Sequence, residues 1–199
     1  AAVRDALLAS ASLAEKVRRK FSIRNTCGYS LNAFTEHEDP VDILKHLLVG
    51  SEGTLGFIYS VTLRTSPIEP LRGTAMVAFK SLTDAMQAVL AMQKKCRLYA
   101  CEFMDDITLR GIAHLPGFPE EFIPQGESSD DCALLLEARS TTPEGLSSTM
   151  QIVEDILRDF SPKNAPHFVT DADECEKLWD IRRALLPASA ATRLPSEYA

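Results

Sequence analysis

The spacing of hydrophobic positions changes along this chain, and each change predicts an element. In residues 3–20 apolar side chains recur every three or four positions, which predicts one amphipathic helix. Asp39 is a residue type suited to cap a helix and Pro40 to its first turn, so a second helix is expected over 41–49. An apolar, β-branched stretch over 56–66 then predicts a strand.

A more regular alternation follows the prolines of residues 66–70, which mark a hinge or domain boundary. The predicted strands lie at 73–81, 98–106, 132–140 and 167–173, and the predicted helices at 81–95, 107–115, 141–160 and 174–191. In helix 81–95 the expected cap is Thr83, and the expected inner face consists of Met86, Val89, Leu90 and Met92 or Gln93. The last helix is expected to be interrupted at Pro187.

This order of elements predicts an α+β fold. Two long helices, each between two strands, indicate a four-stranded antiparallel sheet over 72–170, with helices 83–95 and 143–160 on one face. That arrangement is ferredoxin-like. A fold of this kind does not by itself indicate a function.

Composition narrows the function classes. A net charge of −7 argues against nucleic-acid binding, which needs clustered Lys and Arg, and no apolar run reaches the length of a membrane span. The five cysteines are widely spaced and form no C-x-x-C pair, which favours buried, reduced thiols in a cytoplasmic protein. The four histidines show no metal-ligand spacing, so no metal site is expected in this chain.

The most informative local pattern is the glycine loop G-S-E-G-T-L-G over residues 50–56. Glycine allows positive φ and close approach of backbone to a ligand, and successive amides can form an anion-binding concavity. The spacing matches neither the dinucleotide fingerprint nor the P-loop. A tight turn between helix and strand and a loop that contacts a phosphate both remain open on these residues alone.

A wider stretch resembles a known family. "NTCGYSLNAF" (25–34), "DPVDILKHLLVGSEGTLGFIYSVTLRTSP" (39–67) and "LWDIRRA" (178–184) resemble FAD-linked oxidases of the vanillyl-alcohol oxidase type. The nearest branch is that of D-lactate, glycolate and D-2-hydroxyglutarate dehydrogenases. The resemblance implies that 1–70 is the C-terminal part of an FAD-binding domain and 71–199 an incomplete cap domain that binds substrate.

The resemblance also implies the cofactor and its contacts. FAD is expected to lie against the backbone of the glycine loop and the loop before it. The candidate residues are Asn25, Ser51, Glu52, Gly53, Thr54, Leu55, Gly56 and Ile58. Large members of the branch carry an iron–sulfur segment downstream, so a cluster outside this chain and a peripheral position at the inner membrane stay open.

Arg182 is the candidate for substrate binding. An arginine can hold a carboxylate through two parallel hydrogen bonds, and the Arg of "LW-x-x-R" binds the substrate carboxylate in the resembled dehydrogenases. The alternative is a surface arginine or an ion pair with Glu174 or Glu176. Asp105 and Asp106 form a carboxylate pair after a predicted strand, where a helix cap is the expected role.

Two functions of different classes follow. The first is a piece of an FAD-dependent oxidoreductase that oxidises a small D-2-hydroxy acid, with the isolated piece expected to be inactive and without FAD. The second is a free-standing ferredoxin-like module that senses a ligand or forms a homodimer. The glycine loop favours the first, because a sensing module has no need of it.

Overall fold

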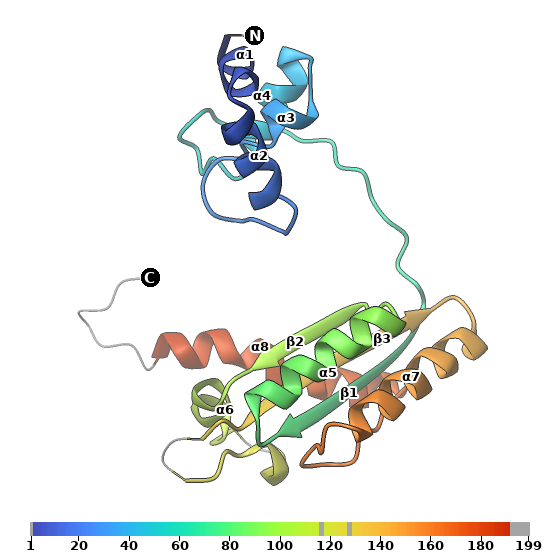
Figure 1. Cartoon of the computed structure of the whole chain (residues 1–199). Coiled ribbons are helices and arrows are strands. Elements are labelled where there is room, and N and C mark those ends of the chain that lie inside the picture. The colour runs from blue at the N-terminus through green and yellow to red at the C-terminus, as the bar shows by residue number, and fades with distance from the viewer. Residues whose placement is uncertain (1, 116–117, 127–128, 192–199) are drawn as a thin grey trace. The chain divides into compact units, whose positions relative to one another are not determined.

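The computed structural model describes residues 2–115, 118–126 and 129–191. The chain divides into two compact units, Ala1–Ser66 and Pro67–Ala199 (Figure 1). Each unit has its own hydrophobic core.

The first unit is helical. Its elements are α1 (Ala2–Ala9), α2 (Ala11–Lys20), α3 (Ala33–Glu36) and α4 (Pro40–Leu48). The single helix expected over 3–20 is wrong, because the chain breaks at Ser10, whose backbone is extended (φ −97°, ψ 97°). Serine competes with helix through local hydrogen bonds and favours such a boundary. Leu7, Ala14 and Val17 still form the small core that the helical spacing indicated.

The start of α4 agrees with the sequence prediction. The Asp39 carboxylate accepts hydrogen bonds from the N–H groups of Val41 and Asp42, at 2.8 and 3.2 Å, and Pro40 occupies the first turn. Two of the donors that every helix leaves unpaired at its start are satisfied in this way. The cap fixes where the helix that precedes the glycine loop begins.

The strand expected over 56–66 is wrong. These residues have no regular secondary structure, and Phe57 and Tyr59 are 89% and 92% exposed. A strand needs a neighbour for its backbone N–H and C=O groups, and no described segment pairs with this one. The apolar alternation is therefore present without the ladder that it predicts.

The second unit is built on an antiparallel sheet. Its strands are β1 (Leu71–Phe79), β2 (Ala100–Met104) and β3 (Cys132–Ser140), in the order β1-β3-β2. Ala75 lies opposite Leu136, and Phe103 lies opposite Leu134. The central strand β3 is buried along most of its length, which explains its nearly continuous apolar sequence.

The sheet has three strands and not the expected four. The segment expected as the fourth strand makes one bridge, in which Thr74 and Val169 exchange two backbone hydrogen bonds of 2.9 Å. Further along β1 the Asn164 side chain takes over, accepting from the N–H of Ala78 and donating to the C=O of Met76. A side chain thus replaces strand backbone, and the ladder ends after one pair.

The two outer edges of the sheet differ. Along β1 the outer groups of Thr74 and Ala78 and the C=O of Met76 have partners, namely Val169, Asn164 and the N–H of Lys163. Because these groups alternate in direction along a strand, the register turns the N–H and C=O groups of Cys101 and Phe103 in β2 away from β3. No strand among the described residues pairs with that outer edge of β2.

Helices cover both faces of the sheet (Figure 1). On one face α5 (Leu82–Lys95) and α7 (Pro143–Arg158) pack against residues such as Val77 and Leu134. The prediction that both long helices share one face is confirmed. On the other face α6 (Asp106–Ile112) and α8 (Ala172–Ala191) pack against residues such as Met76 and Leu135. A short 3-10 helix, η1 (Glu120–Phe122), also joins this side.

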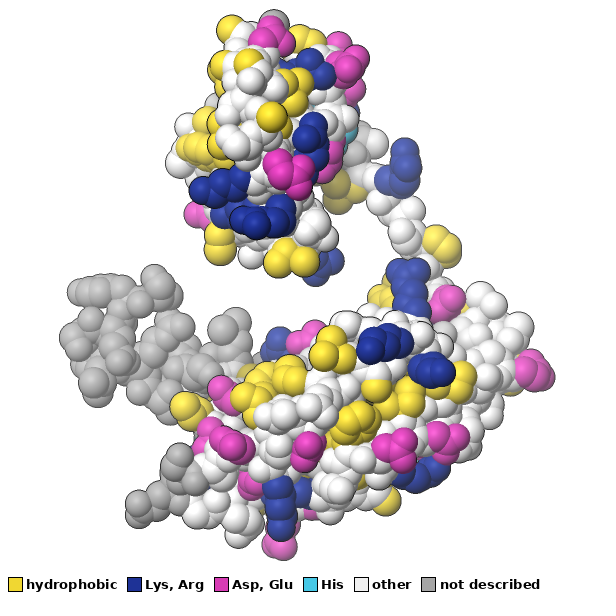
Figure 2. Space-filling view, in the orientation of Figure 1, with side chains coloured by type: hydrophobic (Ala, Val, Ile, Leu, Met, Phe, Trp, Pro, Cys, Tyr) yellow, Lys and Arg dark blue, Asp and Glu magenta, His cyan; other side chains and the backbone are white. Residues whose placement is uncertain are grey.

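The predicted inner face of helix α5 is confirmed only in part. Met92 is buried and Val89 packs against the core, as expected, but Leu90 is 57% exposed. The residues Ala85 and Ala88, which lie outside the predicted face, complete the buried face. Small residues let the helix approach a sheet face already filled by large side chains such as Phe79, Leu134 and Leu136. Its cap is Ser81 and not Thr83, since the Ser81 hydroxyl accepts from the N–H of Asp84. Hydrophobic patches consequently remain on the surface of this unit (Figure 2).

Helix α8 runs through Pro187, so the expected interruption is wrong. A proline inside a helix removes one backbone donor, and here that loss falls near the end of a 20-residue helix. In the described part of the chain no helix combines the length and the apolar character that crossing a bilayer requires.

Candidate functional site

The glycine loop forms a tight turn in the first unit. The N–H of Thr54 donates to the C=O of Ser51 at 3.0 Å, and the two residues between them, Glu52 and Gly53, have φ of 51° and 79°. Gly50 also has a positive φ, of 81°. Positive φ strains a residue with a side chain, so the sequence needs glycine at 50 and 53.

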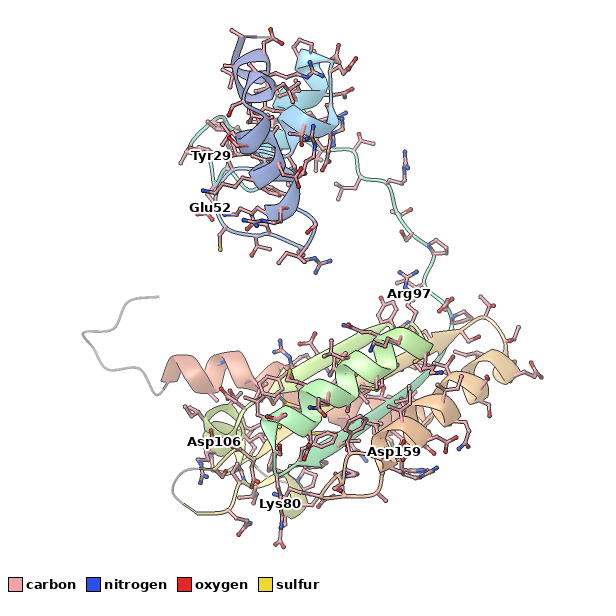
Figure 3. All side chains as sticks on the ribbon, in the orientation of Figure 1. Tyr29, Glu52, Lys80, Arg97, Asp106 and Asp159 are labelled. Carbon is pink, nitrogen blue, oxygen red and sulfur yellow. The ribbon has the colours of Figure 1, made fainter. Side chains whose placement is uncertain are left out.

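The loop that begins at Asn25 lies beside this turn. The Tyr29 hydroxyl and the Thr54 hydroxyl are 2.9 Å apart in a hydrogen bond, and the Ser30 hydroxyl donates to the C=O of Val49. Tyr29 and Glu52 lie near each other on neighbouring loops (Figure 3). The structure therefore brings together two motifs that are separated by some 20 residues in the sequence.

The predicted cofactor residues differ in how much they expose. Ser51 is buried, and its hydroxyl donates to the C=O of Leu48, so this side chain closes the end of α4. The amide of Asn25 donates to the C=O of Cys27. Leu55 and Ile58 are 44% and 49% exposed, and Ile58 lies in the extended segment after the turn.

Gly56 serves a different purpose from the other two glycines of the loop. Its φ is not positive, but a Cβ there would lie 3.1 Å from the Leu48 side chain. Absence of a side chain lets the chain leave the turn close to α4. The even spacing of the three glycines thus combines two backbone requirements with one packing requirement.

The turn has the donors that a phosphate needs. The N–H groups of Glu52, Gly53 and Leu55 donate to no acceptor among the described residues, and all three residues are exposed. Consecutive free amides around positive-φ positions form a concavity that binds anions. The loop therefore offers free backbone donors to an anionic group such as a phosphate.

Arg182 lies in the second unit, on α8. Its Nε–H donates to Glu102 Oε2 of β2 at 2.8 Å, and the two side chains are 37% and 35% exposed. The expected alternative of a pair with Glu174 or Glu176 is wrong. Glu176 instead pairs with Arg72 and Arg183, each at 2.8 Å. Hydrogen bonds from these two arginines hold the pKa of Glu176 below its usual value.

A buried carboxylate anchors the same helix. Glu137 of β3 is 1% exposed, and it accepts a hydrogen bond from Trp179 Nε1 at 2.6 Å. Arg139 Nε lies 2.5 Å from the other carboxylate oxygen, which supplies the opposite charge that a buried acid needs. The Arg139 guanidinium in turn stacks 4.2 Å from the centre of the Tyr99 ring. Because Trp179 and Arg182 are three residues apart, this anchor sets the place of the arginine.

A hollow of about 660 Å³ lies beside α8. Its apolar lining includes Leu115, Phe118 and Ile181, and its charged lining includes Lys177 and Asp180. Arg182 does not line this hollow. The arginine and the hollow are therefore neighbouring features of one helix and not one cavity.

The remaining candidates have structural roles or none that the contacts reveal. Asp105 caps α6 by accepting from the N–H of Thr108, as expected, and Asp106 pairs with Arg110. Within the described residues no three His, Cys, Asp or Glu side chains gather in a way that would hold a metal ion.

The expectation that all five cysteines are buried is wrong, because Cys27 and Cys101 are exposed. Cys27 lies in an open loop. Cys101 lies on the edge strand β2, where it lines a hollow together with Met92 of α5 and keeps part of its surface accessible. Cys132 and Cys175 are buried, as the sequence indicated.

Comparison with known proteins adds to this geometry. Residues 69–198 match the family model described as FAD linked oxidases, C-terminal domain. The chain is 35% identical over 81 residues to a D-2-hydroxyglutarate dehydrogenase of Xanthomonas citri pv. viticola, covering 41% of this chain and 17% of that protein. It is 31% identical over 135 residues to a D-2-hydroxyglutarate dehydrogenase of Stutzerimonas stutzeri, covering 66% and 25%. A D-lactate dehydrogenase of Archaeoglobus fulgidus is 36% identical over 84 residues, covering 42% and 16%.

The chain belongs to the family of FAD-linked oxidases, through their C-terminal domain. Membership of this family implies FAD as the cofactor. The chain spans about a quarter or less of the length of these three relatives. A solved structure of alkyldihydroxyacetonephosphate synthase has a TM-score of 0.55 and 17% identity, covering 77% of this chain and 28% of that one, and shows that the fold is shared.

Proposed function

We propose that this chain is part of an FAD-dependent oxidoreductase that oxidises a small D-2-hydroxy acid, of the lactate, glycolate or 2-hydroxyglutarate class. The observation that carries the proposal is the arginine of α8. Arg182 is held through Nε by Glu102 while its side chain stays 37% exposed, so the outer end of the guanidinium is open to a ligand. Relatives named for D-2-hydroxyglutarate and D-lactate support the substrate class.

In this proposal each unit has its own task. The first unit is the C-terminal part of an FAD-binding domain, and the amides of Glu52, Gly53 and Leu55 hold a phosphate of the cofactor. The second unit is the cap domain, and it binds the substrate. FAD, when bound, would supply the acceptor for the hydride from C2 of the hydroxy acid, while the hydroxyl proton would leave to a base or to water.

The task of Arg182 is to fix the pose of the substrate. The guanidinium holds the carboxylate by parallel hydrogen bonds, and this contact limits how C2 is presented. A hydrogen bond to a charged partner contributes about 1.5–3 kcal/mol. Loss of the arginine should therefore lower transition-state binding by roughly ten- to hundredfold.

The test is steady-state kinetics of the complete FAD-carrying protein with substitutions at Arg182. Arg182→Ala should lower kcat/KM for the hydroxy acid by roughly ten- to hundredfold and leave FAD content unchanged. Arg182→Lys should restore only part of the loss, because an ammonium lacks the planar fork.

Arg183→Ala is the matched control. Arg183 is the next residue on α8, but it points to Glu176 and Asp180 and not to Glu102. The substitution Arg183→Ala removes the same charge and the same side chain as Arg182→Ala. Because Arg183 is not proposed to contact the substrate, kcat/KM should change little. Equal kcat/KM in wild type and Arg182→Ala would refute the assignment.

Family membership favours this function over the alternative of a free-standing sensing or dimerisation module. The exposed turn of residues 52–55, with the free amides of Glu52, Gly53 and Leu55, points the same way, since it is suited to an anionic ligand.

A further inference from the structure

We propose that Glu102 is a positioning residue for substrate binding, and that it acts by orienting Arg182. The inference rests on the proposed function, because it assigns a task relative to the carboxylate that Arg182 would hold. Glu102 comes from β2 and Arg182 from α8, and 80 residues separate them in the sequence. Their contact is therefore made by the tertiary fold and not by local geometry.

The register of the sheet places the Glu102 side chain on the face that α8 covers. Glu102 lies opposite Leu135 of β3, and residues opposite each other in an antiparallel pair project to the same face. Leu135 belongs to the core cluster that packs under α8. The Glu102 side chain thus projects from the edge strand β2 toward α8, where its carboxylate contacts the Arg182 guanidinium.

The contact uses one donor of five. A guanidinium has five N–H donors in a planar fork, and Glu102 accepts from the Nε–H at 2.8 Å. Among the described residues no other acidic side chain lies within ion-pair distance of Arg182. The hydrogen bond to Glu102 fixes the plane of the Arg182 guanidinium, and its outer N–H groups remain available for the carboxylate of the substrate.

Both ends of the Arg182–Glu102 pair rest on rigid elements. Hydrogen bonds to β3 hold Glu102 in the sheet. The hydrogen bond between Trp179 and buried Glu137 holds α8 one turn before Arg182. An arginine without such a partner would sample several rotamers, and ordering them on binding weakens binding by roughly two- to tenfold per side chain. Pre-orientation avoids that cost.

Glu102 also has an effect that weakens substrate binding, because its negative charge reduces the attraction between the Arg182 cation and the incoming carboxylate. Substitution by glutamine separates the two effects. A glutamine oxygen can still accept from Nε–H, but it carries no charge. Alanine removes both the acceptor and the charge.

The experiment compares Glu102→Ala and Glu102→Gln in the complete FAD-carrying protein. Glu102→Ala should raise KM for the hydroxy acid and lower kcat/KM by roughly two- to tenfold, the effect of having to order an arginine side chain on binding. Glu102→Gln should keep kcat/KM within about threefold of wild type. A merely structural role would lower the amount of active protein, and hence kcat, at unchanged KM.

Asp180→Asn is the control, since it removes an acid two residues from Arg182 that pairs with Arg183 instead. Unchanged kinetics in Glu102→Ala, or equal losses in the Ala and Gln variants, would overturn the inference. If Arg182→Ala itself leaves kcat/KM unchanged, the proposed function fails first. If Arg182→Ala is impaired and Glu102→Ala is not, only the positioning role fails.

Discussion

The hydrogen bond between Trp179 and Glu137 should be one of the strongest links between α8 and the sheet. Its donor and acceptor are 2.6 Å apart, and the acceptor carboxylate is almost fully buried. A hydrogen bond to a charged group contributes about 1.5–3 kcal/mol. Replacing indole by phenyl also removes apolar contacts, at a cost of about 1 kcal/mol. Trp179→Phe should therefore destabilise the second unit by about 3 kcal/mol.

The assay must separate the two units and must not depend on the indole. Trp179 is the only tryptophan, so its fluorescence disappears with the substitution. Hydrogen exchange followed by mass spectrometry avoids this problem, because peptides from β3 report on the second unit alone. A loss of about 3 kcal/mol should speed exchange of the most protected β3 amides by roughly a hundredfold.

A double-mutant cycle tests the cause. In a Glu137→Gln background the acceptor is neutral, so Trp179→Phe should cost about 1.5 kcal/mol less than in wild type. Exchange from peptides of residues 2–48 should be the same in all four proteins. Equal costs of Trp179→Phe in both backgrounds would show that the buried charge is not what the indole stabilises.

Two further predictions concern titratable groups. Burial raises the pKa of Asp131, but hydrogen bonds from the Gln125 N–H and the Lys163 ammonium outweigh it and hold the pKa below the usual value. A carboxyl group with a lowered folded-state pKa stabilises the fold above its unfolded-state pKa, and this stabilisation is lost as the pH falls through the folded-state pKa. In urea titrations Asp131→Asn should therefore cost about 3 kcal/mol at pH 7 and clearly less below about pH 4. An equal cost at both pH values would contradict this. Burial, and secondarily Glu102, raises the pKa of Cys101 to about 11. At pH 8 only about a thousandth of this thiol is ionised, so mass mapping should show iodoacetamide labelling Cys27 well before Cys101, and equal rates would contradict this.

Much of the second unit could be predicted because its signals are local. The strands that became β1 and β3 and the helix that became α7 follow from periodicity and from caps within a few residues. The errors lie where an element depends on a distant partner. Residues 56–66 have strand character but no neighbour, and Asn164 replaces most of a fourth strand by a side-chain contact that no periodicity reveals.

The residues of the candidate site also differ in whether the sequence alone reveals them. The glycine loop and Arg182 stand out in the sequence, because positive-φ turns require glycine and "LWDIRRA" resembles a family motif. Glu102 and Glu137 do not, since their partners are 80 and 42 residues away. One signal was available for Glu137: an acid within the apolar run "CALLLEARS" must have a buried partner if that run is a central strand.

The two outer edges of the sheet differ in whether a further strand can pair with them. At β1 the outer backbone groups are occupied by Val169 and the Asn164 amide, so an added strand would first have to displace them. At β2 the outward groups of Cys101 and Phe103 face no strand among the described residues, and the Phe103 side chain is 42% exposed. A further strand, from elsewhere in the protein or from a second copy, could therefore extend the ladder next to β2 without displacing such contacts. Such an addition would lie beside the strand that carries Glu102, so the edge that can be extended is also the edge nearest to Arg182.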